Sequence, residues 1–289
     1  MALFSSSYKP TRKLKRAAIV YDYDGTLAHG NIQENSFLPS IGLNPTEFWQ
    51  KVKATTKKND ADEILVYMQL MLSEAKAKGY PLTKQMLKAH GQSSQLFSGL
   101  KDGSWFSRIN EFSKEHGLEL EHYIISSGTQ EMIEGSPIAK YFKTIFASKY
   151  IYDADGTASW PSLAINYTTK TQFLFRINKG VNNVWDNEKI NAFMPEGERP
   201  IPFSRMIFIG DGDTDIPAMK MTTFNGGHSI ATYDPERDAR TLDKIHGLIS
   251  DGRADFTAPA DFKQNTQMDI MVKGIIGRIA RQEGFRPIS

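Results

Sequence analysis

The sequence contains no cysteine among its 289 residues. This absence excludes disulfides, thiolate metal sites and cysteine nucleophiles, so any chemistry must rest on oxygen and nitrogen groups. An excess of one charge is also lacking, since 35 basic residues face 33 acidic ones, and the balance gives no argument for a nucleic-acid partner. No apolar run approaches the roughly 20 residues that span a bilayer, and the first ten residues lack the order of a secretory signal. We therefore expect a soluble cytoplasmic protein without a nucleic-acid or membrane partner.

The pentapeptide DYDGT places two carboxylates, Asp22 and Asp24, directly after the apolar run of residues 17–21. A run this short predicts a buried strand, and Gly25 ends its extended geometry. In open α/β sheets, ligands bind at the carboxyl ends of the strands. The two acids are therefore placed for chemistry.

The rest of the chain alternates helical and extended patterns. Helices are expected near residues 45–58, 63–78, 83–90 and 105–116, and again from Gln130, from Lys170 and over 269–281. Further strands are expected at 123–125 and 206–210, with two short extended runs around the turn DADGT at 153–157. Residues 182–204 are irregular, although WDNEKINAF can form an extra helix. The pattern predicts an α/β fold with a doubly wound parallel sheet, in which residues 1–30 and 118–289 form the core and residues 31–117 an inserted helical cap.

Polar groups follow each of three predicted strands: Asp22 and Asp24, then Ser126 and Ser127, then Asp211, Asp213 and Asp215. Carboxylates crowded at one sheet edge repel each other unless a cation or protons intervene. Magnesium prefers oxygen ligands of this kind. With Mg²⁺ bound, one aspartate can attack phosphorus, while Ser127, the N–H groups of Gly128 and Thr129, and either Lys170 or Lys179 can hold the phosphate oxygens.

Each of these features also has a purely structural interpretation. A DxD or SSG sequence alone is typical of a solvated turn, and a single lysine near a helix start is usually exposed. DADGT illustrates this, because the preceding run would bury Lys149; we interpret Asp153, Asp155 and Gly156 as turn residues. The position of each group directly after a buried strand is what favours a joint site.

Four ordered motifs resemble those of the haloacid dehalogenase (HAD) superfamily, in its phosphoserine phosphatase-like branch. They are DYDGT at Asp22, YIISSG ending at Ser127 and Gly128, a lysine at a helix start in KTQFLFRINKG, and GDGDTD at Asp211. The cap region is similar only in position and helical character. The resemblance favours Ser127 over Ser126, which does not directly precede the glycine, and Lys170 over Lys179, which lies more than two turns further along.

The resemblance also implies a role for each matched residue. Asp22 would be the nucleophile and a metal ligand, and Asp24 the general acid and base, with its backbone carbonyl on the metal. Lys170 would neutralise developing charge. The remaining roles would be phosphate binding by Ser127, Gly128 and Thr26, and metal binding by Asp211 and Asp215 together with Asp22 and Asp24.

These observations predict a Mg²⁺-dependent phosphatase that hydrolyses a small phosphorylated metabolite through an aspartyl-phosphate on Asp22. A phosphotransferase or phosphomutase would use the same intermediate, and a catalytically silent protein that binds a phosphorylated ligand is the alternative outside enzymes. Glu34 lies in the region where phosphoserine phosphatases carry an acid that selects the amino acid, but its spacing does not align it. The substrate, the cap residues that select it and the oligomeric state remain open at this stage.

Overall fold

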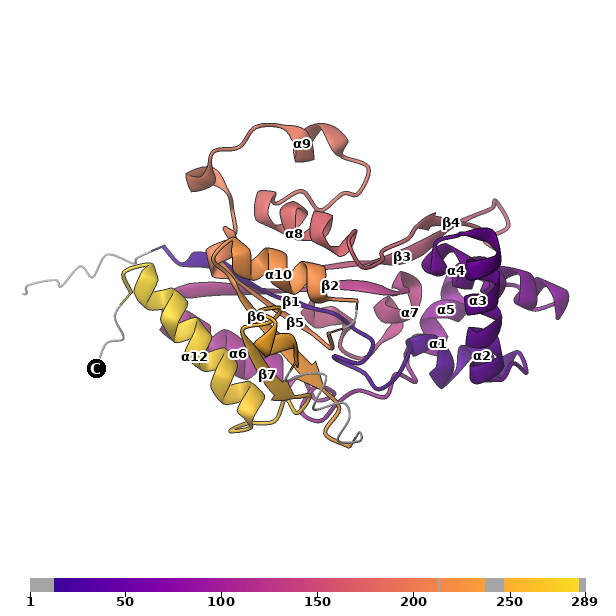
Figure 1. Cartoon of the computed structure of the whole chain (residues 1–289), viewed down its shortest axis with the longest axis horizontal. Helices are drawn as coiled ribbons and strands as arrows, with labels where there is room; N and C mark the ends of the chain where they lie inside the picture. Colours follow the sequence, from indigo (N-terminus) through magenta and orange to yellow (C-terminus); the bar gives the residue numbers. More distant parts are fainter. Residues whose placement is uncertain (1–12, 213, 237–246, 286–289) are drawn as a thin grey trace, which may run out of the picture.

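A single sheet organises the chain, shown in Figure 1. The computed structural model describes residues 13–212, 214–236 and 247–285. Within these residues the sheet has seven strands in the order β4-β3-β2-β1-β5-β6-β7, and every neighbouring pair is parallel except β3 and β4. The strands are β1 Lys15–Tyr21, β2 Leu118–Thr129, β3 Thr144–Tyr152, β4 Ala158–Leu163, β5 Met206–Gly210, β6 His228–Tyr233 and β7 Phe256–Pro259.

The strand order makes β1 the central reference of the sheet. From β1 the chain builds β2, β3 and β4 on one side, and it later returns to add β5, β6 and β7 on the other. Such a reversal opens a crevice at the carboxyl ends of the strands next to the switch point. The doubly wound parallel sheet predicted from the sequence is therefore confirmed, and β1, β2 and β5 meet at its switch point.

Helices cover both faces of the sheet because β1 is apolar on both sides. Ile19 and Tyr21 pack into the core on the face that carries α6 (Ser104–Glu115) and α12 (Gln267–Gln282), while Val20 packs on the opposite face with α8 (Lys170–Lys179) and α10 (Ile216–Phe224). A strand buried on both faces needs this near-continuous apolar pattern. This pattern is the reason why a strand could be predicted from the apolar run of residues 17–21.

Between β1 and β2 the chain is helical, as predicted. Helices α1 to α5 gather at one end of the molecule in Figure 1, whereas α6 packs against β2 and α12. Capping residues determine where the two longest helices of this segment begin. The Asn44 side chain accepts the Glu47 N–H at the start of α3, and the Asp62 side chain caps α4. The bounds are α1 Ile32–Asn35, α2 Phe37–Ser40, α3 Pro45–Asn59, α4 Glu63–Ala77 and α5 Lys84–Gly91.

The segments after β2 also follow the predicted pattern. The DADGT segment forms the turn between β3 and β4: the Asp153 N–H donates to the Thr157 carbonyl at 2.9 Å, and Gly156 adopts φ +82°. The irregular stretch of residues 182–204 contains one short helix, α9. The remaining elements are α7 Gln130–Gly135, α9 Asn187–Asn191 and three 3₁₀ turns, Ala139–Tyr141, Glu196–Glu198 and Phe203–Arg205.

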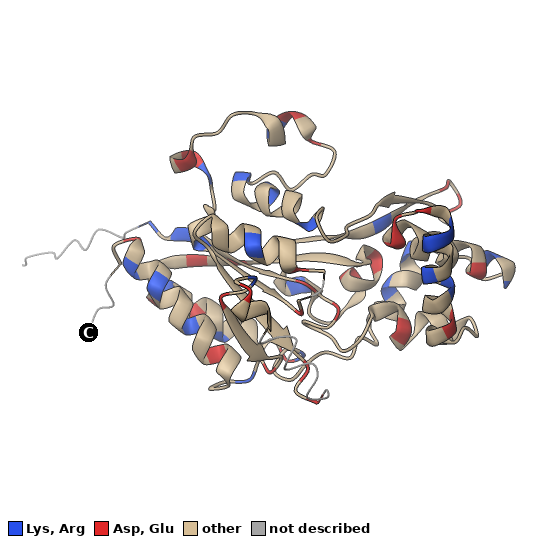
Figure 2. Ribbon diagram, in the orientation of Figure 1, with Lys and Arg blue, Asp and Glu red and all other residues tan. Residues whose placement is uncertain are grey.

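Helices α3, α4 and α12 each carry both acidic and basic residues, as Figure 2 shows. This distribution agrees with the net charge of +2. Among the helices that the structure describes, none is both long enough and apolar enough to cross a bilayer.

Helix α5 crosses α7 at two glycines that bring the backbones together. A Cβ at Gly91 would lie 1.8 Å from the carbonyl oxygen of Met132, and a Cβ at Gly135 would lie 1.9 Å from that of Lys88. Neither position has room for a methyl group. The end of the helical insert is thereby fixed against the helix that follows β2.

We predict that Gly91→Ala or Gly135→Ala lowers the free energy of unfolding by about 1–3 kcal/mol, because the added methyl group forces the two backbones apart. Urea unfolding followed by circular dichroism measures the change. Gly274→Ala in α12 is the matched control, since its Cβ meets nothing within 4 Å, and it should stabilise by about 0.5–1 kcal/mol. Equal effects at all three positions would contradict the close crossing.

Candidate active site

Three aspartates converge at the carboxyl ends of β1 and β5. Asp22 directly follows β1, its N–H donates to the Ile209 carbonyl at 2.9 Å, and its side chain is buried. One carboxylate oxygen from each of Asp22, Asp211 and Asp215 lies within 4.8 Å of the other two. Asp213, which the sequence analysis grouped with them, lies outside the described residues. The fold thus gathers acids from two strands at its switch point.

Lys170 supplies the positive charge of this cluster from the first turn of α8. It is fully buried, and its Nζ lies 3.1 Å from Asp22 Oδ1 and 2.6 Å from Asp215 Oδ1. Burial alone would lower the pKa of this ammonium, but the charges of the two aspartates outweigh burial and raise it. Lys179, the alternative in the sequence, instead donates to the carbonyl groups of Ile190 and Ala192.

Two glycines leave room for the acids. A Cβ at Gly25, which has φ +76°, would lie 2.4 Å from Asp211 Oδ2, and a Cβ at Gly210 would lie 2.2 Å from Asp215 Oδ2. Asp215 Oδ2 in turn accepts the Asp211 N–H at 3.1 Å. Gly25 therefore does more than end the strand: because it has no side chain, it leaves room for the carboxylate of Asp211, which follows β5.

Asp22 and Asp24 have different electrostatic environments. Burial and the charge of Asp215 raise the pKa of Asp22 to about 6, while Lys170 holds it from rising further. Burial and the neighbouring charge of Asp22 raise the pKa of Asp24 well above its ordinary range. Both carboxyls therefore keep their protons to a higher pH than a free aspartate does, and their environments differ, as suits a nucleophile beside an acid. Asp24 Oδ1 also accepts the Ile32 N–H at 2.9 Å.

The two serines at the end of β2 differ in their partners. Ser126 Oγ accepts the Gly128 N–H at 3.0 Å, whereas the buried hydroxyl of Ser127 has no hydrogen-bond partner in the described part of the chain; Ser127 lines a cavity. Gly128 lies against the acid, because a Cβ there would be 2.8 Å from Asp24 Oδ2. The Thr26 hydroxyl is also buried without a partner, but Thr26 does not line the cavity.

The cavity has a volume of about 380 Å³ and lies between these strand ends and the helical insert. Part of its wall comes from the helices of the insert. Trp49 and Tyr67 line it, while Met68, Met71 and Phe97 are buried in the core. Its lining consists of Asp24, Asn31, Gln33, Trp49, Lys53, Glu63, Ile64, Tyr67, Ser127, Gly128, Tyr167 and Thr214.

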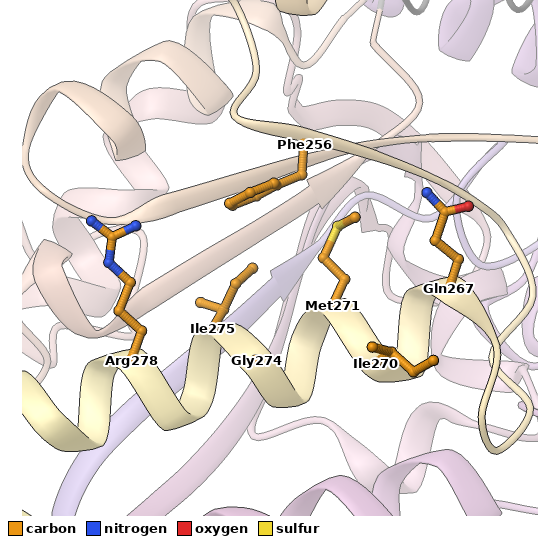
Figure 3. Close-up of a pocket in the computed structure, with 7 residues that line it drawn as sticks. All are labelled: Phe256, Gln267, Ile270, Met271, Gly274, Ile275 and Arg278. Atoms are coloured by element: carbon orange, nitrogen blue, oxygen red, sulfur yellow. The ribbon is translucent and has the colours of Figure 1, made fainter.

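A second, larger cavity lies away from the acids. It has a volume of about 550 Å³ and lies between β7 and α12, where Figure 3 shows the apolar side chains of Phe256, Met271 and Ile275 facing it. None of its lining residues is acidic. This cavity therefore offers no carboxylate for chemistry.

The aspartate cluster fits a hard divalent cation. Asp22, Asp211 and Asp215 offer only oxygen atoms, and three acids around one ammonium leave excess negative charge in a buried place. Oxygen ligands and water are what Mg²⁺ prefers, whereas zinc favours nitrogen and sulfur.

Comparisons with known proteins agree on the fold. No family model matches the sequence. An uncharacterized protein of Borreliella burgdorferi is 28% identical over 228 residues, which cover 71% of this chain and 77% of that protein. A HAD-family hydrolase from Salmonella enterica serovar Typhi has a TM-score of 0.56 at 16% identity, with 91% of this chain and 72% of that one covered.

Two further solved structures are phosphoserine phosphatases. A probable phosphoserine phosphatase from Vibrio cholerae has a TM-score of 0.55 at 13% identity, with 93% of this chain and 67% of that one covered. A phosphoserine phosphatase in the form of a phospho-aspartyl intermediate analogue has a TM-score of 0.51 at 16% identity, with 90% and 99% covered. These likenesses show that the chain has the fold of HAD-type hydrolases, which confirms at the level of the fold the resemblance seen in its motifs.

We predict that Gly210→Ala weakens the binding of a divalent cation at the aspartate cluster at least about tenfold, because the new methyl group displaces the carboxylate of Asp215 and disturbances next to a metal ligand typically cost that much. Titration calorimetry on the purified protein measures the affinity without any substrate. Gly197→Ala is the control, since its Cβ meets nothing within 4 Å. Unchanged Mg²⁺ affinity in Gly210→Ala would show that Asp215 takes no part in cation binding.

A raised carboxyl pKa makes stability depend on pH. Because the folded-state pKa of Asp24 is above its unfolded value, its contribution is fully present below the unfolded pKa and is lost as pH rises through the folded one. Without divalent cations, Asp24→Asn should therefore have a higher Tm than the parent at pH 8, by about 2–4 °C for each kcal/mol gained, and the gap should close towards pH 4. Thermal scans in EDTA measure this. Asp153→Asn, in the exposed turn, is the control and should show no such gap. A lower Tm for Asp24→Asn than for the parent at pH 8 would show that the ionised Asp24 carboxylate does not destabilise the folded chain.

Proposed function

We propose that this chain, which has the fold of HAD-type hydrolases, is a Mg²⁺-dependent phosphatase that hydrolyses a phosphate monoester of a small metabolite through an aspartyl-phosphate on Asp22. The observation that carries the proposal is the cluster itself. Asp22 contacts a buried lysine, lies beside two further acids, and shares the switch point with the unpartnered hydroxyl of Ser127. One solved structure of this fold is that of a phosphoserine phosphatase with an analogue of its phospho-aspartyl intermediate. This supports a covalent route for the present chain.

Different residues of the site would offset the negative charge of the bound phosphate and hold its oxygen atoms. Asp22, Asp211 and Asp215, with the backbone carbonyl of Asp24, would hold Mg²⁺, which when bound offsets the negative charge of the phosphate facing the nucleophile. Lys170 neutralises the charge that develops on the phosphoryl oxygens. The hydroxyls of Ser127 and Thr26 would donate to phosphate oxygens. The Gly128 N–H, which donates to Ser126 Oγ at 3.0 Å, would join them by exchanging that partner for phosphate.

In the first step, an ionised oxygen of Asp22 attacks phosphorus. The new P–O bond to Asp22 forms as the bond from phosphorus to the leaving alcohol oxygen breaks, and the carboxyl proton of Asp24 passes to that oxygen. Burial and the charge of Asp22 raise the pKa of Asp24, which favours the protonated form that this step needs.

In the second step, a water molecule attacks the phosphorus of the aspartyl-phosphate and gives its proton to the Asp24 carboxylate. The bond between phosphorus and Asp22 breaks, so phosphate leaves and both aspartates return to their starting states. An acceptor alcohol in place of water would make the same site a phosphotransferase or mutase. Adding acceptor alcohols during turnover and analysing the products distinguishes the two activities.

We further propose that the helical insert is a cap that excludes water during the first step. Helix α4 reaches the core through two hydroxyl groups: Tyr67 donates to the Ser127 carbonyl at 2.7 Å, and Tyr150 donates to the Met68 carbonyl at 2.9 Å. Asn166 of the core also donates to Asp62, which caps α4. Because α6 packs on the sheet, the covering part of the insert would be α1 to α5.

The cysteine-free composition supports a cytoplasmic location.

We predict that Asp22→Asn lowers Mg²⁺-dependent phosphate release from p-nitrophenyl phosphate by at least about a thousandfold, as expected for the loss of a nucleophile. Release by the parent should stop in EDTA and return with added Mg²⁺. The exposed variant Asp153→Asn is the control and should keep full activity. Full activity in Asp22→Asn would rule out this nucleophile.

A further inference from the structure

We infer that the substrate of this site is a nucleoside 5′-monophosphate, whose ribose hydroxyl meets Gln33 and whose base lies against Trp49 and Tyr167. The inference rests on the proposed phosphatase function and specifies its substrate class. Three features of the 380 Å³ cavity carry it: an unpartnered buried amide, aromatic walls, and uncommitted charged groups on the insert.

Gln33 has a buried amide oxygen to which no described residue donates. Its side chain is 1% exposed and lines the cavity. Its Nε2 is 3.4 Å from Thr129 Oγ1, and its Oε1 has no partner among the described residues. A buried amide oxygen without a donor costs about 1–3 kcal/mol. Because Gln33 shares the cavity with Ser127 and Gly128, a donor close to the phosphate would satisfy it. A hydroxyl of the leaving group is such a donor.

Aromatic side chains reach the cavity from two parts of the fold. Trp49 lies on α3 of the insert, and Tyr167 comes from the loop before α8, where its side chain is 48% exposed. Tyr67 stands next to Trp49, with ring centroids 5.6 Å apart and an angle of 62° between the rings. A planar base gains about 1–3 kcal/mol on such a surface.

Glu34 holds Trp49 in place through one carboxylate oxygen, and it is not among the residues that line the cavity. Its Oε1 accepts the indole N–H of Trp49 at 2.5 Å and the side-chain N–H of Asn31 at 2.6 Å. The acid in the region where phosphoserine phosphatases select their amino acid thus supports an aromatic wall here. This arrangement favours a ring over a free amino acid.

Lys53 and Glu63 supply polar groups for the edge of a base. Lys53 lies one turn after Trp49 on α3, Glu63 begins α4, and both line the cavity. Among the described residues neither forms an ion pair or a side-chain hydrogen bond. One donor and one acceptor near a ring match the carbonyl and amino groups that bases carry.

Other small phosphates satisfy only part of this set. Ribose 5-phosphate has hydroxyl donors but no planar ring, phosphoserine has a donor but no ring, and phosphocholine has neither. A cavity of this volume falls within the roughly 300–1,000 Å³ that holds drug-sized ligands. Unlike these three compounds, a nucleotide provides the phosphate, the donor and the planar ring together.

The first experiment compares phosphate release by the full chain with Mg²⁺ from AMP, UMP, ribose 5-phosphate, phosphoserine and phosphocholine, with p-nitrophenyl phosphate as a probe of the chemistry alone. We expect kcat/KM for at least one nucleotide to exceed that for ribose 5-phosphate by tenfold or more. Hydrolysis of p-nitrophenyl phosphate with ribose 5-phosphate or phosphoserine as good as both nucleotides would overturn the substrate class and leave the phosphatase standing.

If no compound is hydrolysed, the proposed function fails, and binding then decides the inference separately. AMP and UMP should raise the Tm of the Mg²⁺-loaded chain more than ribose 5-phosphate does. Equal or absent shifts would overturn the nucleotide site as well.

The second experiment tests the two contacts. Gln33→Met should raise KM for the preferred nucleotide about tenfold, and the same variant should lose nothing further when the matching ribose hydroxyl is removed in the 2′- or 3′-deoxy nucleotide. Additive losses in this cycle for both deoxy nucleotides would overturn the contact. Tyr167→Leu should raise KM while Tyr167→Phe does not, and Trp185→Leu, an exposed aromatic outside the cavity, is the control. Unchanged KM in Tyr167→Leu would remove this wall of the base site.

Discussion

The site depends on one buried ammonium group. Lys170 contacts carboxylates from two different strand ends, Asp22 after β1 and Asp215 after β5. Without it, acids packed this closely would repel each other across a region that water barely reaches. The lysine therefore ties α8 to the centre of the sheet and keeps Asp22 more acidic than Asp24. The side chains of Lys170, Asp22 and Asp215 thus both stabilise the packing of α8 on the sheet and form part of the proposed active site.

Much of the fold could be predicted because its signals are local. Residues 17–21 and 206–210 are apolar on every position, which is the pattern of strands buried on both faces, and Asn44 and Asp62 cap the helices that they precede. The catalytic candidates Asp22, Asp211 and Lys170 could be predicted for the same reason, since each directly follows a buried strand or begins a helix. Their convergence then follows from the parallel order of β1 and β5.

The substrate end of the cavity could not be predicted in this way. Whether Trp49 or Tyr67 faces a cavity or packs into a bundle depends on how α3 and α4 sit on the core, and helical spacing is the same in both cases. Gln33 has no distinguishing neighbours in the sequence, and its importance appears only once its buried oxygen is found without a donor. The packing of α6 on the sheet likewise depends on its contact with α12, which follows it by more than 150 residues.

The glycine crossing of α5 and α7 has a mechanical consequence. Gly91 and Gly135 bring backbone against backbone, and α7 starts at the residue after β2 ends, next to Ser127. Helix α5 therefore cannot move away from the core without disturbing the end of β2, where Ser127 lies. Helix α4 meets the core differently, through its packing on β4 and through hydroxyl and amide hydrogen bonds of Tyr67, Tyr150 and Asn166. The segment that joins α4 to α5 is also tied to the core, because the Ala158 N–H donates to the Leu82 carbonyl at 2.7 Å. A movement of α3 and α4 would thus leave α5 and this segment in place.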